Sequence, residues 1–425
     1  MTTTLTPPID THEESPLAHL SAEQLEALAA EFDAIKDRVA AELGEDDRRY
    51  IEAMIEMQRR LAVIGRIGLL LPRFRPLAAG GATALAAAKI LENMEIGHNV
   101  MHGQWDWMND PRVHSSTWDW DNASTAEAWK HSHNYVHHTF TNIRGKDKDL
   151  GYEIMRIDPH QKWHPVYLLQ PLYNLVLAGL FEWGVALHDL DFEAIRKGEK
   201  PMPQVRKELR GIAGKARDQV VKDYIAWPLI SALASAAVGA AAEASKPEPH
   251  PWRRLRRKPK GRLARITRRA LADGTQAYRR TAAANAGANL ARNVWAYAII
   301  FCGHFPDQTY TYSPAEVEDE GRGGWYIRQL TGAANIEGSP LFHVASGNLG
   351  YQVEHHLFPD MPSSRYAEIA PQVKDICERY GLPYNSGPFL QQLGMVQRTI
   401  LRLAFPGGRA RPKPGAYRAE TSEGR

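Results

Sequence analysis

Closely spaced histidines are the residues of this sequence best suited to chemistry. The chain has 17 histidines in 425 residues, and the tightest groups lie at three places. In GHNVMH, His98 and His102 are four residues apart, so both imidazoles lie on one face of a helix, about one turn apart. Such a pair can reach one metal ion, although isolated pairs are also common among buried structural histidines.

The second group, WKHSHNYVHHTFTN, is denser. His133 and His137 have the same spacing, His138 adjoins them, and His131 lies two residues before His133. Imidazoles this close would repel one another if protonated and would lose hydration if buried. A metal that binds neutral imidazole explains their density, and a solvated polar loop is the alternative.

The third group, GNLGYQVEHHLFP, contains the adjacent pair His355 and His356. Neighbours on a helix point about 100° apart, so this pair suits two nearby metals better than one. The three groups together offer seven nitrogen ligands, and one zinc needs only three or four. Cys302 and Cys377 are the two cysteines, too few for an iron–sulfur cluster. This surplus of histidine predicts a binuclear site, with iron favoured because histidine-rich redox metals serve oxygen activation.

Helices must carry these groups. Residues 21–60 predict an amphipathic helical stretch that starts at Ser21 and has an apolar stripe of Leu25, Leu28, Phe32, Ile35 and Val39. Residues 61–71 and 77–98 are apolar and are separated by PRFRP. They predict either a kinked hairpin or one membrane span with an interfacial lead-in.

Three further apolar stretches follow at 166–187, 224–244 and 282–305. Each is long enough to span a bilayer, but the mean hydropathy of −0.43 is that of a soluble protein. Buried helices of a large soluble protein are therefore the alternative. The formal net charge of +3 does not indicate a nucleic-acid partner. The first residues lack the basic and apolar regions of a secretory signal, so we expect any insertion to use internal segments.

The order HxxxH, HxxxHH and QxxHH, separated by long apolar stretches, resembles the membrane fatty-acid desaturase family. The likeness is to bacterial acyl desaturases whose third box begins with glutamine, and it covers about residues 48–400. It implies an all-α, integral membrane helical bundle whose cytoplasmic helical cap carries a histidine-rich di-iron site. It also implies a multi-pass protein of the bacterial cytoplasmic (inner) membrane, with the active site facing the cytoplasm.

The resemblance further implies an oxygen-dependent desaturase that introduces a cis double bond into a fatty acyl chain, linked to coenzyme A or to a lipid. The cofactors would be two Fe ions, with O2 as co-substrate. In the family a histidine ends the last spanning helix, and His304 in FCGHF occupies that place. The predicted metal ligands are therefore His98, His102, His133, His137, His138, His304, His355 and His356. Candidate residues to orient them by hydrogen bonds are Asn99, Asn134, Gln352 and Glu354.

An external electron donor follows from the same resemblance. The chain lacks the HPGG haem signature of relatives with a fused cytochrome domain, so two electrons must come from a separate partner, such as a ferredoxin and its reductase. Two alternatives remain. One is a lipid hydroxylase of the same histidine-box class, and the other is a non-catalytic membrane relative.

We expect residues 1–20 and 406–425 to be disordered and 21–405 to form the desaturase domain. All ligands must lie on one side of the membrane, which favours 224–244 and 282–303 as a crossing pair and leaves 166–187 interfacial. The run from Arg253 to Arg269 has ten Lys or Arg in seventeen residues and then falls on the outer side, against the usual bias. In the alternative topology 166–187 and 224–244 cross the membrane, and His304 then no longer lies at the end of a spanning helix. Residues 246–280 are hence interpreted as an insertion or a shifted reading frame.

Overall fold

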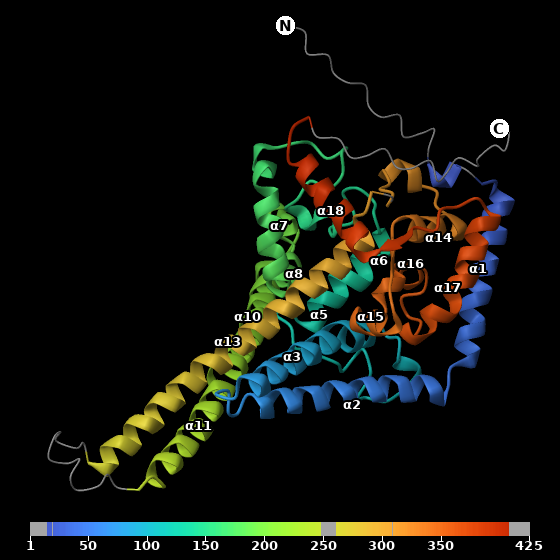
Figure 1. The fold of residues 1–425 in the computed structure, drawn as a ribbon. Helices are drawn as coiled ribbons and strands as arrows, with labels where there is room; N and C mark the ends of the chain where they lie inside the picture. Colours follow the sequence, from blue (N-terminus) through green and yellow to red (C-terminus); the bar gives the residue numbers. More distant parts are fainter. Residues whose placement is uncertain (1–14, 19, 248–260, 308, 408–425) are drawn as a thin grey trace, which may run out of the picture.

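The computed structural model in Figure 1 is mostly helical and describes residues 15–18, 20–247, 261–307 and 309–407. Its strands β1 (Asn335–Glu337) and β2 (Ser386–Pro388) form one short parallel pair. The predicted helical class is therefore confirmed, with this strand pair added. Most of the two segments predicted to be disordered, and residues 248–260 of the basic segment, lie outside the described residues. Residues 16–18 form a 3-10 turn, η1 (Pro16–Ala18).

The helix α1 (Ala22–Glu42) begins where the sequence predicts. The Ser21 side chain accepts a hydrogen bond from the Gln24 backbone N–H, and the Gln24 side chain accepts one from the Ser21 backbone N–H. Phe32 is fully buried and its ring centre lies 4.9 Å from that of Tyr326 and 6.3 Å from that of Phe358. Since Phe358 closely follows the third histidine group, α1 packs against the segment that carries it.

The next two helices, α2 (Glu45–Gly68) and α3 (Arg75–Leu91), lie side by side as a hairpin (Figure 1). The hairpin was the first of the two predicted alternatives. Glycines let the helices approach closely: a Cβ on Gly68 would lie 2.8 Å from the Gly81 Cα, and one on Gly65 would lie 2.9 Å from the Leu85 backbone nitrogen. Small residues at the contact are typical of closely packed membrane helices.

The apolar stretch 166–187 is divided into three short pieces. They are η6 (Pro165–Leu169), α7 (Gln170–Gly179) and α8 (Phe181–His188), with a break at Leu180. None reaches the ~20 residues that a spanning helix needs. Their outer surface is nevertheless apolar, with Leu172, Leu175 and Val176 all more than half exposed.

Two long helical runs form a hairpin that projects from the rest of the molecule (Figure 1). One run comprises α10 (Met202–Val220), η7 (Val221–Ala226) and α11 (Trp227–Ala244), and the other is α13 (Arg262–His304). Gly239 lies against Asp273, Gly274 against Ala232, and Asn285 donates to the Asp223 carbonyl. The apolar stretch 224–244 therefore lies beside the basic first half of α13. The other predicted crossing segment, 282–303, is the second half of α13 and lies further along the hairpin. That both segments cross a membrane stays a prediction.

A buried charge cluster ties the long hairpin to the α2–α3 hairpin. Asp223 has no exposed side-chain surface and accepts hydrogen bonds from Arg66 at 2.9 Å and Lys89 at 2.8 Å. Arg66 also donates to Asn285 at 2.7 Å. Removing one partner of such a buried pair would leave an uncompensated charge. This cluster fixes α13, and with it His304 at the end of the helix.

The remaining elements form the compact part of the fold that surrounds the histidines. Its helices are α4 (Asn99–Met101), α5 (Ala126–Trp129), α6 (His138–Phe140), α9 (Phe192–Lys197), α14 (Arg322–Thr331), α15 (Pro340–Ala345), α16 (Gln352–Leu357), α17 (Tyr366–Arg379) and α18 (Phe389–Leu403). Its short turns are η2 (Glu92–His98), η3 (Asp106–Met108), η4 (Lys130–His137), η5 (Leu150–Glu153), η8 (Pro314–Val317), η9 (Leu349–Tyr351) and η10 (Ser363–Arg365).

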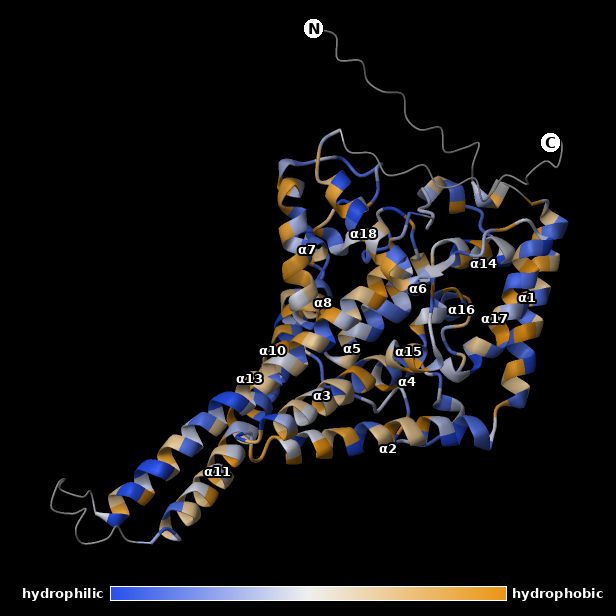
Figure 2. Ribbon diagram, viewed as in Figure 1, coloured by the Kyte–Doolittle hydropathy of each residue, from blue (hydrophilic) through white to orange (hydrophobic). Residues whose placement is uncertain are grey.

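One helix among the described residues, Met202–Ala244, is long and apolar enough to cross a membrane. A core helix of a soluble protein can have the same composition, but little of the most apolar window of this helix is buried. In Figure 2, α11 is more apolar in colour than the neighbouring part of α13, which is hydrophilic. The predicted bundle of several membrane-spanning helices is therefore not confirmed by the described helices.

The glycine contact between α2 and α3 can be tested by adding one methyl group. Gly68→Ala places a Cβ against the backbone of Gly81, so we expect it to lower the free energy of unfolding by about 1–3 kcal/mol through overpacking. Gly80→Ala is the matched control because a Cβ there meets no atom within 4 Å. Thermal unfolding of the purified variants in mild detergent is the measurement. Equal melting temperatures for the two variants would contradict the close packing.

Candidate metal centre

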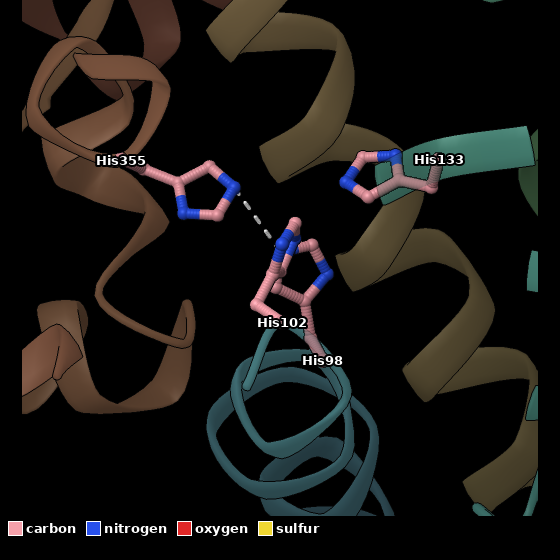
Figure 3. A group of neighbouring side chains, drawn as sticks. All are labelled: His98, His102, His133 and His355. Carbon is pink, nitrogen blue, oxygen red and sulfur yellow. Dashed lines mark hydrogen bonds between the residues drawn. The ribbon is translucent and has the colours of Figure 1, made fainter. Parts of the chain in front are cut away.

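Four histidines from distant parts of the chain meet in one group (Figure 3). The ligand nitrogens of His98, His102, His133 and His355 all lie within 4.8 Å of one another. The Nε2 atoms of His98 and His355 face each other at 3.4 Å. His98 and His102 come from η2 and the end of α4, His133 from η4, and His355 from α16. The first, second and third sequence groups thus contribute to one set.

A second group lies beside the first. His137, His138 and His356 also have their ligand nitrogens within 4.8 Å of one another. The His304 ring centre lies 4.8 Å from that of His137 and 4.9 Å from that of His356, so the end of α13 adds a fourth ring. His138 joins the groups, with its ring centre 4.8 Å from that of His102 and 5.0 Å from that of His355. Two sets of four imidazoles can hold two neighbouring metal ions.

The local backbone helps to bring these rings together. His98 ends a π-helical turn, η2, and both His133 and His137 lie on another, η4. The sequence predicted ordinary α-helical spacing at both places. A π-helical turn inserts an extra residue into the helix and is frequent at functional sites. His131 lies on η4 as well, but it is exposed and stacks on Tyr135 instead of joining either group.

Unpaired nitrogens aimed into the groups show that these residues fit a metal. The Nε2 atoms of His102, His133, His137, His138 and His356, and Nδ1 of His304, are buried and have no hydrogen-bond partner. A buried polar atom without a partner is costly in a folded protein. Two metal ions, one in each group, would satisfy these nitrogens. The absence of cysteine from both groups makes the donor set one that suits iron, zinc or copper rather than a thiolate-bound metal.

Carboxylates behind the second histidine group were missed by the sequence reasoning. His137 Nδ1 lies 3.1 Å from Asp147 Oδ1, and Asp149 Oδ2 lies 3.6 Å from the Nδ1 atoms of both His133 and His137. The other Asp149 oxygen is 3.0 Å from His188 Nε2. A carboxylate at Nδ1 keeps the proton there and leaves Nε2 free for a metal. The KDKD run that directly follows the box was the available signal.

Uncharged side chains hold the other rings. His355 Nδ1 lies 3.2 Å from the Tyr366 hydroxyl, and His356 Nδ1 lies 3.1 Å from Gln329 Oε1. Gln352, one of the four polar residues proposed from sequence, lies 3.2 Å from His304 Nε2.

The other three proposed polar residues have different partners. The Asn99 amide donates to the carbonyls of Glu95 and Gly347, and the Asn134 amide donates to the Met101 carbonyl. Glu354 accepts from Tyr384 and Asn335.

The electrostatics of the cluster favour neutral imidazole at every proposed ligand except His137. Burial, reinforced by repulsion among the rings, lowers the pKa of His138, His355 and His356 well below the ordinary histidine value. For His137, burial also disfavours the charged form, but the carboxylates of Asp147 and Asp149 outweigh it and raise the pKa to about 9. Neutral imidazole is the form that binds a metal.

A narrow cavity of about 50 Å³ opens beside His98 and His133. Its lining includes the apolar residues Trp120, Phe181 and Val185 and the polar residues Asp149 and His188. Because a water molecule takes up about 30 Å³ in the liquid, the cavity has room for one or two small molecules. It places apolar surface directly beside the unpaired nitrogens.

Comparison with known proteins adds family information. The sequence model described as fatty acid desaturase matches residues 208–388. The chain is 43% identical to the NADPH-dependent stearoyl-CoA 9-desaturase of Mycobacterium tuberculosis over 390 residues, which cover 92% of this chain and 82% of the relative. It is 25% identical to the sn-1 linoleoyl-lipid 6-desaturase of Synechocystis over 336 residues, which cover 75% of this chain and 78% of that relative.

A shorter match links the chain to an animal protein. It is 40% identical to human fatty acid desaturase 3 over 87 residues, 20% of each chain. No solved structure matches the sequence.

Replacing Asp149 tests whether it orients the histidines. Asp149→Asn removes the charge that favours the Nδ1–H form of His133 and His137, so we expect metal affinity to fall about 10- to 100-fold. Asp119→Asn is the control, because Asp119 is an exposed residue paired with Lys215. Metal titration followed by elemental analysis of the folded protein is the measurement. Unchanged affinity in the Asp149 variant would show that this carboxylate does not support the site.

Proposed function

The chain belongs to the fatty acid desaturase family, and we propose that it is a membrane-bound acyl-CoA desaturase that uses two irons and O2. As a member of that family it is an enzyme, an oxidoreductase of lipid metabolism. The proposed product is a cis-unsaturated acyl chain. The observation that carries this proposal is the pair of neighbouring histidine groups whose buried nitrogens have no partner in the protein.

The proposed ligands are the eight histidines of the two groups. His98, His102, His133 and His355 would hold one iron, and His137, His138, His304 and His356 the other. Iron bound there would supply the oxidation of the acyl chain with O2. Asp147 and Asp149 hold protons at the Nδ1 atoms behind the ligands, and Tyr366 and Gln329 fix the rings of His355 and His356.

The apolar residues that line the cavity would position the substrate. A saturated chain offers no charge or hydrogen-bonding group, so only the shape of an apolar channel can select one carbon pair. Trp120, Phe181 and Val185 line such a surface beside His98 and His133. At about 50 Å³ the cavity cannot contain a whole fatty acyl chain, so binding requires side chains along it to move.

The mycobacterial relative supports acyl-CoA as the substrate class, because its name specifies stearoyl-CoA and the 9 position. We propose the same substrate and position for this chain. The name also specifies NADPH. NADPH, through a separate reductase, is hence the electron source that we propose in place of a ferredoxin-led chain.

The proposed location is the bacterial cytoplasmic membrane, with the histidine groups on the cytoplasmic side. The exposed apolar residues of α7 and α11 and the length of the Met202–Ala244 helix support contact with lipid. Several crossings remain part of this proposal only for the α2–α3 hairpin, whose two helices lie side by side.

Metal content and product analysis test the proposal together. Purified protein should carry close to two irons and convert stearoyl-CoA, with NADPH and a reductase, to a chain lighter by two hydrogens. His137→Ala and His355→Ala should each lose iron and reduce turnover by more than about 100-fold. His131→Ala is the control from the same helical turn and should keep both iron and turnover, because His131 is exposed and outside the groups.

Other results would contradict specific parts of this proposal. A chain heavier by one oxygen would make the protein a hydroxylase. Zinc in place of iron would contradict the two-iron centre, and two irons with no change in any acyl-CoA would contradict acyl-CoA as the substrate.

The cavity predicts how chain length is selected. Val185→Phe adds a ring to the lining and should lower turnover of 18-carbon relative to shorter acyl-CoA by about 10-fold or more, while iron content stays unchanged. Leu187→Phe is the matched control, because Leu187 lies two residues away, is 49% exposed and does not line the cavity. Turnover of a series of acyl-CoA lengths is the measurement. The same chain-length profile for both variants would place the substrate elsewhere.

A further inference from the structure

The far end of the long hairpin has a surface that the desaturase reaction does not explain. We define the hairpin tip as residues 227–247 of α11 and its end, and residues 261–281 of α13. The tip projects beyond the α2–α3 hairpin, whose turn contacts it at Leu69 through Ser231 and Thr281 (Figures 1 and 2). Beyond that contact, α11 and α13 pack only on each other among the described elements.

The α11 side of the tip is apolar on its outer face. Its buried residues are small or polar: Pro228, Ser231, Ser235 and Gly239. Its outward residues are Leu229, Ile230 and Leu233, which are 47%, 44% and 71% exposed. A helix of a water-soluble protein has the reverse arrangement, with its apolar stripe buried. The outer face of α11 is therefore suited to a lipid environment.

The α13 side of the tip is basic. The tip carries seven Lys or Arg and two Asp or Glu. Both acidic residues are already paired, Glu243 with Lys246 at 2.6 Å and Asp273 with Arg269 at 2.8 Å. Arg268 and Arg279 are exposed and have no carboxylate partner among the described residues. Leu263 and Leu271, 77% and 65% exposed, lie among these arginines.

The basic charge argues against a simple crossing by the tip. With 43 residues, α13 is about 64 Å long at 1.5 Å per residue, roughly twice the bilayer core. A crossing by α11 would take the arginines beside it into hydrocarbon, where charged side chains are expensive. If the tip lay in water, the apolar outer face of α11 would be exposed to solvent, which is unfavourable.

An anionic bilayer surface accommodates both the apolar outer face of α11 and the basic residues of α13. We propose that the hairpin tip lies along the surface of a bilayer that contains anionic phospholipid. The outer face of α11 enters the boundary of the acyl chains, and the arginines of α13 lie among the lipid phosphates. This inference goes beyond the proposed reaction and does not depend on it.

A single cysteine can report where the tip lies. Both native cysteines are buried, so Leu233→Cys in the full chain gives one reactive thiol on α11. The full chain is placed in nanodiscs of phosphatidylcholine alone, or of equal phosphatidylcholine and phosphatidylglycerol. A membrane-impermeant maleimide should label Leu233→Cys at least about 10-fold more slowly in the anionic discs. Lys374→Cys, on exposed α17 surface, should be labelled equally in both.

Removing charge from the tip should reverse the protection. Each basic residue near an anionic surface contributes about a fivefold preference, so Arg268→Gln with Arg279→Gln should speed labelling by about 25-fold in anionic discs. Arg206→Gln with Arg210→Gln removes the same charge from exposed positions on α10 and should have no effect. Unchanged iron content and circular dichroism confirm that each variant is folded.

Three results would overturn the proposal. Equal labelling of Leu233→Cys in the two lipids would show that anionic lipid is not recognised. Slow labelling of Leu233→Cys in both lipids that is unchanged by the arginine substitutions would show that α11 lies inside the hydrocarbon. Protection that depends on the number of chains per disc would show contact with a second copy.

Discussion

The structure depends on holding eight imidazoles buried and close together. Their ring centres lie about 5 Å from those of their neighbours, a spacing at which two protonated rings would repel strongly. Many of their inward nitrogens have no partner in the protein, which is costly without a ligand. The rest of the fold must therefore supply enough packing to keep these rings in place, and a bound metal would convert the cost into stabilisation.

The surrounding elements divide this task. Phe32 of α1 packs near Phe358, behind His355 and His356, and the buried pairing of Asp223 with Arg66 and Lys89 fixes the hairpin that ends in His304. Asp149 contacts three histidines from two segments, His133, His137 and His188. Packing thus sets where each ring lies, and hydrogen bonds to the outer nitrogen set which nitrogen is free.

The long hairpin shows how the same chain meets a second environment. Next to its tip, Asp223 of the hairpin forms a buried ion pair with Lys89, whereas the tip has apolar residues facing outward on α11 and arginines on α13. The two halves of α13 therefore have different surroundings, although they belong to one helix. Basic residues beside an apolar face are both accommodated at the boundary between lipid phosphates and acyl chains.

The sequence by itself determined the helical class, the capped start and buried stripe of α1, and the three histidine groups, because these depend on spacing within one helix. It did not reveal Asp147 and Asp149 as supports, although the KDKD run was a signal for them, and it did not reveal His188, which only folding brings against Asp149. It proposed 224–244 and 282–303 as membrane crossings, and only the structure shows that 224–244 packs against the basic half of α13. Apolar length predicts that a segment can meet lipid, but the register of two helices is decided by contacts such as Gly239 with Asp273 and Asp223 with Asn285, which no local pattern contains.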